Sequence, residues 1–225
     1  RIAYAWQIRD INILLSDQIS PSSRIQNRRQ IRNRVKTVAP FLKLDKDPYP
    51  VLDQKGKIWW MLDTYTTTDR YPYSTPSSEG FNYIRNSVKA VVDAYEGTVD
   101  FYIADASDPI ILTYARIFPG LFKPIDEMPD GLRAHTRYPE DIFNTQSDMY
   151  QIYHMQDPQN FYNNEDLWAF ASEKFGQSDE LQMVEPYYMI MKLPGEEREE
   201  FVQLLPYTPS QRKNLIGWLA ARSDG

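Results

Sequence analysis

Three segments of this chain carry the pattern of a β-hairpin, and helical patterns separate them. Residues 49–65, 88–104 and 187–205 each contain two runs of β-branched and aromatic residues joined by a polar turn or loop. The middle segment is the clearest, because Glu96-Gly97 supplies its turn. The hairpins are not part of a repeated strand–helix–strand pattern, which would predict a parallel sheet. The sequence therefore predicts an α+β fold, with helices packed on antiparallel hairpins in a single compact domain or two closely packed lobes.

Five stretches have the spacing or the end signals of a helix. They are residues 4–19, residues 31–42 with Pro40 near the end, residues 108–118, a helix opened by Pro139, and a final helix that starts at about Pro209. In the first stretch, apolar residues recur every three or four positions, which predicts one opening helix of about four turns that packs along one side. In the last, Thr208, Pro209 and Gln211 combine an N-cap, a first-turn proline and a capping-box residue.

Composition excludes several classes of protein. The net charge of -6 argues against a nucleic-acid partner, because a phosphate backbone attracts proteins with an excess of Lys and Arg. The apolar runs stop at five residues, far short of the roughly 20 needed to span a bilayer. The absence of cysteine removes disulfides and thiolate chemistry. Because the chain begins at Arg1 without a methionine and ends at Gly225 directly after a helical pattern, we expect a piece cut from a longer protein.

Neither metal nor cofactor chemistry is predicted. His135 and His154 are the only histidines, and their spacing would not place two imidazoles on one metal ion. The chain contains no phosphate-binding glycine loop, dinucleotide fingerprint or serine elbow. We therefore expect no cofactor and no metal site, and the motifs identify no catalytic residue.

A polar, tyrosine-rich stretch follows a predicted strand. Residues 63–74 concentrate hydroxyl groups, two carboxylates, a guanidinium and three tyrosine rings, and residues 66–80 read as a long loop. Such mixtures of flat rings and directional polar groups commonly hold sugars or peptides. The alternative is a loop whose Asp and Thr side chains bond its own backbone. Together with three residues further along the chain, the candidate ligand-binding residues are Asp63, Tyr65, Asp69, Arg70, Tyr71, Tyr73, Arg85, His135 and Glu140.

Paired carboxylates keep an enzymatic alternative open. Asp63, Asp69 and Glu79 flank the tyrosine-rich stretch, and Glu140 lies near His135 in the sequence. Glycoside hydrolysis needs only two carboxyl groups at a set separation. A solvated acidic surface is the simpler explanation in an acidic chain. The enzymatic hypothesis requires two of these groups to share one solvent-open cleft.

A run of cations is the strongest charge anomaly. No acidic residue lies between Arg24 and Lys36, and the run consists of Arg24, Arg28, Arg29, Arg32, Arg34 and Lys36. We expect these side chains to pair with an acidic surface elsewhere, since the chain is negative overall. The alternative is contact with lipid phosphates or another anionic partner.

Several short sequence segments, in the same order along the chain, resemble those of one known family. They are residues 9–12, 63–74, 80–89, 117–124, 137–141, 153–155, 161–163, 193–196 and 218–225. Over essentially its whole length the chain resembles the soluble domain of uncharacterised protein family 0182, which comprises large multi-pass membrane proteins of bacteria.

The resemblance implies a location and leaves the reaction open. Family members have an N-terminal block of membrane helices followed by a large domain outside the cytoplasm, so we expect residues 1–225 to be part of that extracytoplasmic domain, held at the cell membrane by upstream transmembrane helices. The family has no established activity to carry over. Our leading hypothesis is a noncatalytic module that binds an envelope polysaccharide, a lipid or a partner protein. The alternatives are an envelope hydrolase or transferase, and a structural extension that clamps the membrane helices or mediates self-association.

Overall fold

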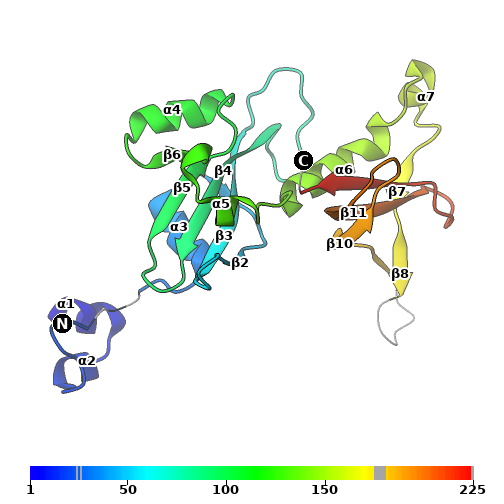
Figure 1. Ribbon diagram of the computed structural model, residues 1–225. Helices are drawn as coiled ribbons and strands as arrows, with labels where there is room; N and C mark the ends of the chain where they lie inside the picture. Colours follow the sequence, from blue (N-terminus) through cyan, green and yellow to red (C-terminus); the bar gives the residue numbers. More distant parts are fainter. Residues whose placement is uncertain (24, 26, 175–180, 224–225) are drawn as a thin grey trace.

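The protein consists of two lobes and a separate N-terminal segment (Figure 1). The computed structural model describes residues 1–23, 25, 27–174 and 181–223. The first lobe comprises residues 31–133, the second comprises residues 139–223, and residues 134–138 connect them. Each lobe combines helices with a sheet rich in antiparallel pairs. The predicted α+β class is therefore confirmed.

A six-stranded sheet forms the centre of the first lobe. Its strands are β1 (Lys43–Leu44), β2 (Tyr49–Leu52), β3 (Ile58–Thr68), β4 (Tyr83–Asp93), β5 (Val99–Ile103) and β6 (Phe122–Pro124). They run in the order β1-β3-β4-β5-β6, with β2 also paired to β3, and only the β5–β6 pair is parallel. The first two predicted hairpins are confirmed as β2–β3 and β4–β5. Gly97 has φ 69° in the second turn, a conformation that glycine adopts without strain.

Helices cover both faces of this sheet, which explains why β3 and β4 are buried along most of their length. The four helices are α3 (Ile31–Val38), α4 (Pro109–Ile117), the 3-10 helix η1 (Ile125–Glu127) and α5 (Asp130–Arg133). Neighbouring residues of a strand point to opposite faces. Leu62 therefore joins Val35 and Ile111, from α3 and α4, on one face. Met61 joins Leu132 on the other.

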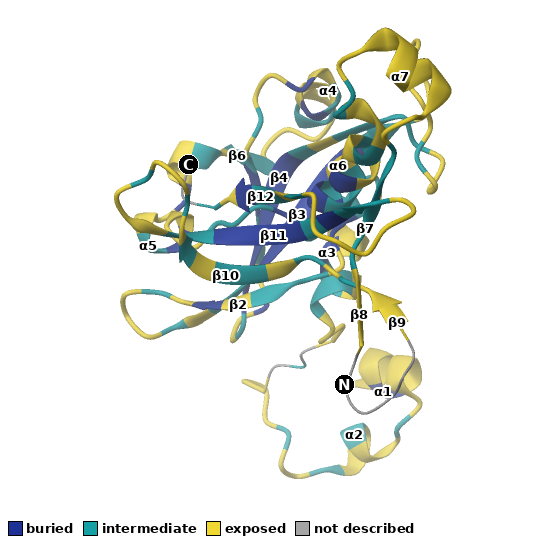
Figure 2. Ribbon diagram, turned by 90° about the vertical axis from the view of Figure 1, so that its right-hand side faces the viewer, coloured by how far each residue is buried: buried dark blue, intermediate teal, exposed yellow. Residues whose placement is uncertain are grey.

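The second lobe is built on a four-stranded sheet and one long helix. The strands of this sheet are β7 (Trp168–Phe170), β10 (Tyr187–Lys192), β11 (Glu199–Pro209) and β12 (Gly217–Arg222). Strands β8 (Ser172–Lys174) and β9 (Leu181–Met183) form a separate pair. The helices of the lobe are α6 (Glu140–Tyr153) and α7 (Pro158–Asn163). The third predicted hairpin is confirmed as β10–β11. Phe143 of α6 packs against Leu205 and Ala221 of the sheet. Figure 2 shows the buried residues concentrated in β3, β4, β11 and the inner side of α6.

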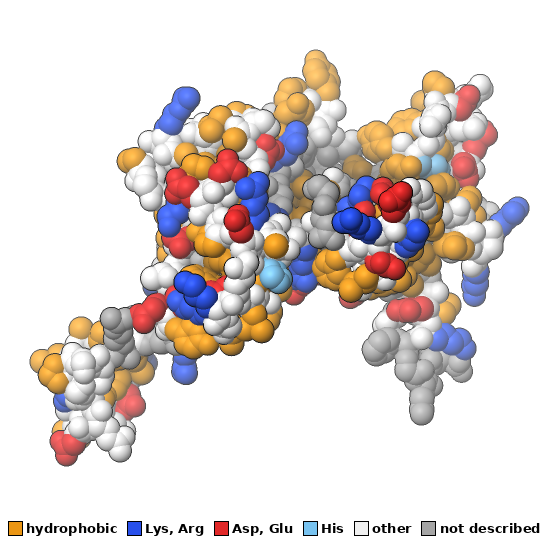
Figure 3. Space-filling view, in the orientation of Figure 1, with side chains coloured by type: hydrophobic (Ala, Val, Ile, Leu, Met, Phe, Trp, Pro, Cys, Tyr) orange, Lys and Arg blue, Asp and Glu red, His pale blue; other side chains and the backbone are white. Residues whose placement is uncertain are grey.

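The N-terminal segment departs from its predicted form. It contains two short helices, α1 (Ile2–Ile8) and α2 (Asn12–Leu15), so the prediction of one helix of about four turns is wrong. Arg9 ends α1 in a left-handed conformation with φ 58°, and the Asp10 side chain accepts a hydrogen bond from the Asn12 backbone N–H at 2.9 Å. The apolar stripe remains largely exposed: Ile11 is 66% exposed and Leu15 is 70% exposed, and hydrophobic side chains lie on the surface of this segment (Figure 3).

The predicted final helix is also wrong. Thr208 and Pro209 continue β11, where they pair with Ala169 and Trp168 of β7, and the chain then turns back as β12. The capping signals are local, whereas the pairing of Thr208 and Pro209 with β7 extends β11 through these residues and holds them in a strand. In the same way β3 extends through Thr68, so the loop predicted for residues 66–80 begins at Asp69.

Candidate functional site

The tyrosine-rich stretch is divided between two environments. Asp63 and Tyr65 lie on β3, and both are buried. The residues after Thr68 leave the sheet, and the rings of Tyr71 and Tyr73 are exposed. The first half of the stretch therefore belongs to the interior, and the second half belongs to the surface.

A buried ion pair joins β3 to β4. Asp63 lies directly opposite Lys89 in the strand register, and the Lys89 ammonium donates a hydrogen bond to the Asp63 carboxylate. Asn86 Nδ2 lies 3.3 Å from the same carboxylate oxygen, and Lys89 Nζ lies 3.3 Å from the backbone oxygen of Arg137. Burial raises the pKa of Asp63, and the Lys89 ammonium opposes that rise. Through Lys89 the pair reaches the connector between the lobes.

Asp45 ties the first lobe to the start of α6. Its carboxylate accepts hydrogen bonds from the Tyr65 hydroxyl, the Asp47 N–H at 2.8 Å and the Asp141 N–H at 3.1 Å. Burial, and then the Asp45 charge, raises the pKa of Tyr65 above its ordinary value. A buried carboxylate with three donors is well satisfied, which is the condition for keeping such a charge inside a protein.

Arg137 completes this contact from the connector. Its guanidinium pairs with Asp47 and lies between two tyrosine rings, 3.7 Å from the ring centroid of Tyr49 and 4.7 Å from that of Tyr188. The Tyr188 hydroxyl donates to the Tyr138 backbone oxygen at 2.8 Å. These side chains, together with Asp45, Asp63, Tyr65 and Lys89, form what we call the lobe junction. It fixes the position of the second lobe on the first.

A cleft opens beside the lobe junction. This interlobe cleft has a volume of about 470 Å³ and is lined by Lys46, Ser77, Ser78, Glu79, Phe81, Asp141, Asn144, Thr145, Asp148, Met149 and Phe170. Its walls come from the β3–β4 loop on one side and from α6 and β7 on the other. Hydroxyl, amide and carboxylate groups thus converge on a space that also contains two phenylalanine rings.

The pKa values of two carboxyl groups in this cleft, Asp141 and Glu79, are shifted in opposite directions. Asp141 is 5% exposed, its Oδ1 lies 3.6 Å from Lys46 Nζ, and its Oδ2 is buried without a hydrogen-bond partner. Burial, and then the nearby Asp45 charge, raises the pKa of Asp141. Glu79 accepts a 2.6 Å hydrogen bond from Lys43, which lowers the pKa of Glu79. The cleft therefore combines a carboxyl group whose pKa is raised with one whose pKa is lowered.

The exposed half of the tyrosine-rich stretch is held by one asparagine. The Asn82 side chain accepts from the Tyr71 N–H at 2.9 Å and donates to the Tyr71 oxygen at 2.7 Å, and Ser74 Oγ donates to the Asn82 oxygen at 2.8 Å. The Tyr71 ring stacks on that of Tyr83, with centroids 5.5 Å apart. The loop is thus ordered by its own contacts while its rings remain open to solvent.

The other predicted ligand-binding residues are scattered. Arg85 lies 3.9 Å from Asp105 at the surface, and Nδ1 of the exposed His135 is 2.8 Å from the Gly131 oxygen. Glu140 is the first residue of α6, and burial followed by the Asp45 charge raises its pKa. None of the nine predicted residues is among those that line the interlobe cleft. Asp63 and Tyr65 belong to the lobe junction behind it.

Sequence reasoning missed the α6 side of the cleft, although a signal was present. Asp141, Asn144, Thr145 and Asp148 recur at intervals of three and four, so they form one polar stripe on a helix. A polar stripe is usually the solvated face of a surface helix. Only the position of the β3–β4 loop opposite α6 makes this stripe the wall of a cleft.

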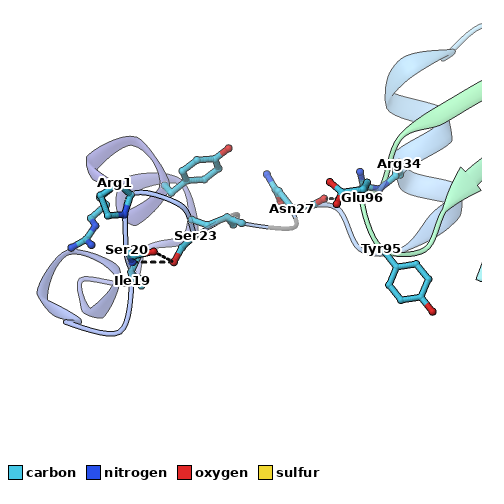
Figure 4. A pocket seen from close by; sticks show the side chains of 11 residues that line it. Arg1, Ile19, Ser20, Ser23, Asn27, Arg34, Tyr95 and Glu96 are labelled. Carbon is cyan, nitrogen blue, oxygen red and sulfur yellow. Dashed lines mark hydrogen bonds between the residues drawn. The ribbon is translucent and has the colours of Figure 1, made fainter. Parts of the chain in front are cut away.

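A further cavity lies between the N-terminal segment and the β4–β5 turn. Its volume is about 860 Å³. In Figure 4 the side chains of Arg1, Ile19 and Ser20 lie at one end, those of Arg34, Tyr95 and Glu96 lie at the other, and that of Asn27 lies between them, so the labelled polar groups are spread along the cavity. A ligand site requires convergent polar groups, so we assign none here.

Among the residues that the structure describes, no group of three or more His, Asp and Glu side chains is arranged to hold a metal ion. Within the same ranges, no helix has both the length and the apolar character required to cross a membrane.

Comparison with known proteins gives one family. A family model described as an uncharacterised protein family, UPF0182, matches residues 1–225. A UPF0182 protein of Pelotomaculum thermopropionicum is 55% identical over 225 residues, which are 100% of this chain and 24% of that protein. A UPF0182 protein of Microcystis aeruginosa is 55% identical over 228 residues, with 100% and 24% covered. The chain thus spans about a quarter of the length of these curated relatives. No solved structure matches it.

Proposed function

We propose that this chain, which belongs to the uncharacterised protein family UPF0182, is an extracytoplasmic domain of a membrane protein that binds a hydroxyl-rich envelope component, such as a polysaccharide, in the interlobe cleft. The observation that carries the proposal is the lining of that cleft. Carboxylate, amide and hydroxyl groups there surround a volume of about 470 Å³ beside Phe81 and Phe170. Directional polar groups next to flat rings suit a ring-shaped ligand with many hydroxyl donors.

The buried oxygen of Asp141 supports this choice of ligand. An acceptor that is buried without a donor costs free energy, and a hydroxyl group of a bound ligand would supply the missing hydrogen bond. The lobe junction supports it as well, because its hydrogen bonds and ion pair join the two walls of the cleft, and a preorganised cleft lowers the entropy cost of binding.

The location outside the cytoplasm rests on the resemblance to multi-pass membrane proteins. The chain spans about a quarter of its relatives, so the remaining length leaves room for membrane segments. The location is tested in cells that contain the whole protein. Protease added to intact spheroplasts should cleave this domain, and protection until the membrane is lysed would contradict the proposal.

Binding is tested by thermal unfolding of the chain with envelope polysaccharide fragments. A ligand that binds only the native state, present well above its dissociation constant, should raise the Tm by about 5 °C or more. Asp148→Asn, in the cleft, should reduce this shift. Glu127→Gln is the matched control, since it removes an equal charge from an exposed site on η1 in the first lobe. Equal shifts in both variants would contradict binding in the cleft.

One observation favours an envelope hydrolase as a second candidate. Glu79 and Asp141 line the same cleft and have their pKa values displaced in opposite directions, as expected for a base or nucleophile and a general acid. If this function is correct, the polysaccharide fragments are cleaved, and Glu79→Gln and Asp141→Asn each abolish cleavage. Binding without any release of shorter fragments would exclude it.

A further inference from the structure

A second cleft, on the first lobe, is lined by three cations. Arg32 and Lys36 are one helical turn apart on α3, and Lys43 follows on β1. All three line a volume of about 530 Å³ together with the polar side chains of Gln30, Asn33 and Thr67. Among its described lining residues there is no carboxylate, although the chain as a whole has a net charge of -6. We call this the cationic cleft.

The cations of this cleft are incompletely paired. Within the described part of the chain, neither Arg32 nor Lys36 makes an ion pair, and the buried Nε of Arg32 has no hydrogen-bond acceptor. Lys36 Nζ donates to the Leu42 backbone oxygen at 3.1 Å, which uses one of its three donors. The expectation that this run of cations pairs with an acidic surface is therefore wrong for these two residues. Arg24, in the same run, lies outside the described residues.

The arrangement is unfavourable unless an anion is present. Like charges at positions i and i+4 of a helix repel each other, and Arg32 and Lys36 have that spacing. Among the residues that the structure describes, the only carboxylate paired with a cation of the cleft is that of Glu79, which contacts Lys43 at 2.6 Å and lines the interlobe cleft on the other side. An anion between α3 and β1 would replace the repulsion with attraction and would accept the hydrogen bond that Arg32 Nε lacks.

We propose that the cationic cleft is a binding site for a phosphate group, either free or on a lipid headgroup. A guanidinium and two ammonium groups can surround the oxygens of one phosphate, and the planar Arg side chain can donate two parallel hydrogen bonds to it. The neutral donors of Gln30, Asn33 and Thr67 can hold the remainder of the ligand. This site is separate from the interlobe cleft and does not depend on what binds there.

The proposal is tested with inorganic phosphate and with vesicles. Phosphate should raise the Tm of the chain more than chloride at the same ionic strength does, and the apparent affinity should fall about tenfold in Lys36→Gln and further in the double variant R32Q/K36Q. Arg116→Gln is the matched control, because Arg116 is an exposed cation in the last turn of α4, on the same face of the same sheet. It should keep the full response.

The vesicle arm identifies the source of the phosphate. If the ligand is a lipid headgroup, the chain binds phosphatidylglycerol vesicles but not phosphatidylcholine vesicles, and R32Q/K36Q loses this binding. If the chain responds to inorganic phosphate but not to vesicles, the ligand is a free phosphate. No response to either probe overturns the proposal, and so does an equal response in R32Q/K36Q and the parent. If the double variant does not fold, Lys36→Gln decides, since Lys36 is exposed. Asp148→Asn should leave phosphate binding unchanged, which separates this site from the interlobe cleft.

Discussion

Asp63 and Asp69 are six residues apart in the same tyrosine-rich stretch, yet one is 3% exposed and paired with Lys89 while the other lies in solvent, 3.8 Å from Arg70. Tyr65 and Tyr71 differ in the same way. The first half of the stretch is covered because β3 lies at the contact between two lobes, and the second half has left the sheet. The contribution of an ion pair or a hydroxyl group to folding stability therefore depends on how deeply it is buried, and not on its neighbours in the sequence.

The largest expected effect comes from leaving Lys89 without its carboxylate. Asp63→Ala should lower the free energy of unfolding by about 3–5 kcal/mol, because a buried charge then has no counter-charge. Asp69→Ala should change it by less than about 0.5 kcal/mol. Urea unfolding of both variants measures the difference. Equal losses of unfolding free energy in the two variants would contradict the difference between the two halves of the stretch.

The second effect tests the buried hydroxyl. Tyr65→Phe removes only the oxygen that donates to Asp45 and should cost about 1–3 kcal/mol. Tyr71→Phe makes the same chemical change on an exposed ring and should have almost no effect. Thermal unfolding of the pair provides the measurement. If Tyr65→Phe leaves the stability unchanged, the hydrogen bonds from backbone N–H groups are sufficient for the Asp45 carboxylate.

The third effect appears as a dependence on pH. Because burial raises the pKa of Asp141 in the folded state, that state holds the proton more tightly than the unfolded chain does. The free energy of unfolding should therefore fall as the pH rises from below the ordinary pKa of Asp through the raised one. Asp141→Asn cannot titrate, so its stability relative to the parent should increase over this range. A constant difference from pH 3 to pH 7, a range of about four units, would contradict the assignment.

The smallest effect belongs to the exposed loop. Tyr71→Ala removes the stacking on Tyr83 and should cost about 0.5–1 kcal/mol, whereas Tyr73→Ala should cost less, since that ring is fully exposed. Neither should alter the Tm shift produced by a ligand of the interlobe cleft. If Tyr73→Ala abolishes that shift, the exposed half of the stretch contributes to the binding site after all.

Most of the fold was predictable, because its signals are local. The three hairpins follow from strand patterns and turn residues such as Gly97, and α4 follows from Asp108, whose side chain caps two backbone N–H groups. The failures occurred where a distant partner decided the outcome. Pro209 continues a strand because β7 lies beside it, and the apolar stripe of residues 4–19 remains largely exposed.

The candidate sites were predictable only in part. The chemical groups available could be read from the sequence: an acidic chain with carboxylates and tyrosines around Asp63, a run of cations ending at Lys36, and membership of one family over residues 1–225. Which of these groups face one another became clear from the folded arrangement. It buried Asp63 against Lys89, placed Glu79 opposite α6, and gave Arg32 and Lys36 no carboxylate partner within the described part of the chain. The physical reason is that side-chain type is a property of one residue, whereas burial and charge pairing depend on segments far apart in the chain.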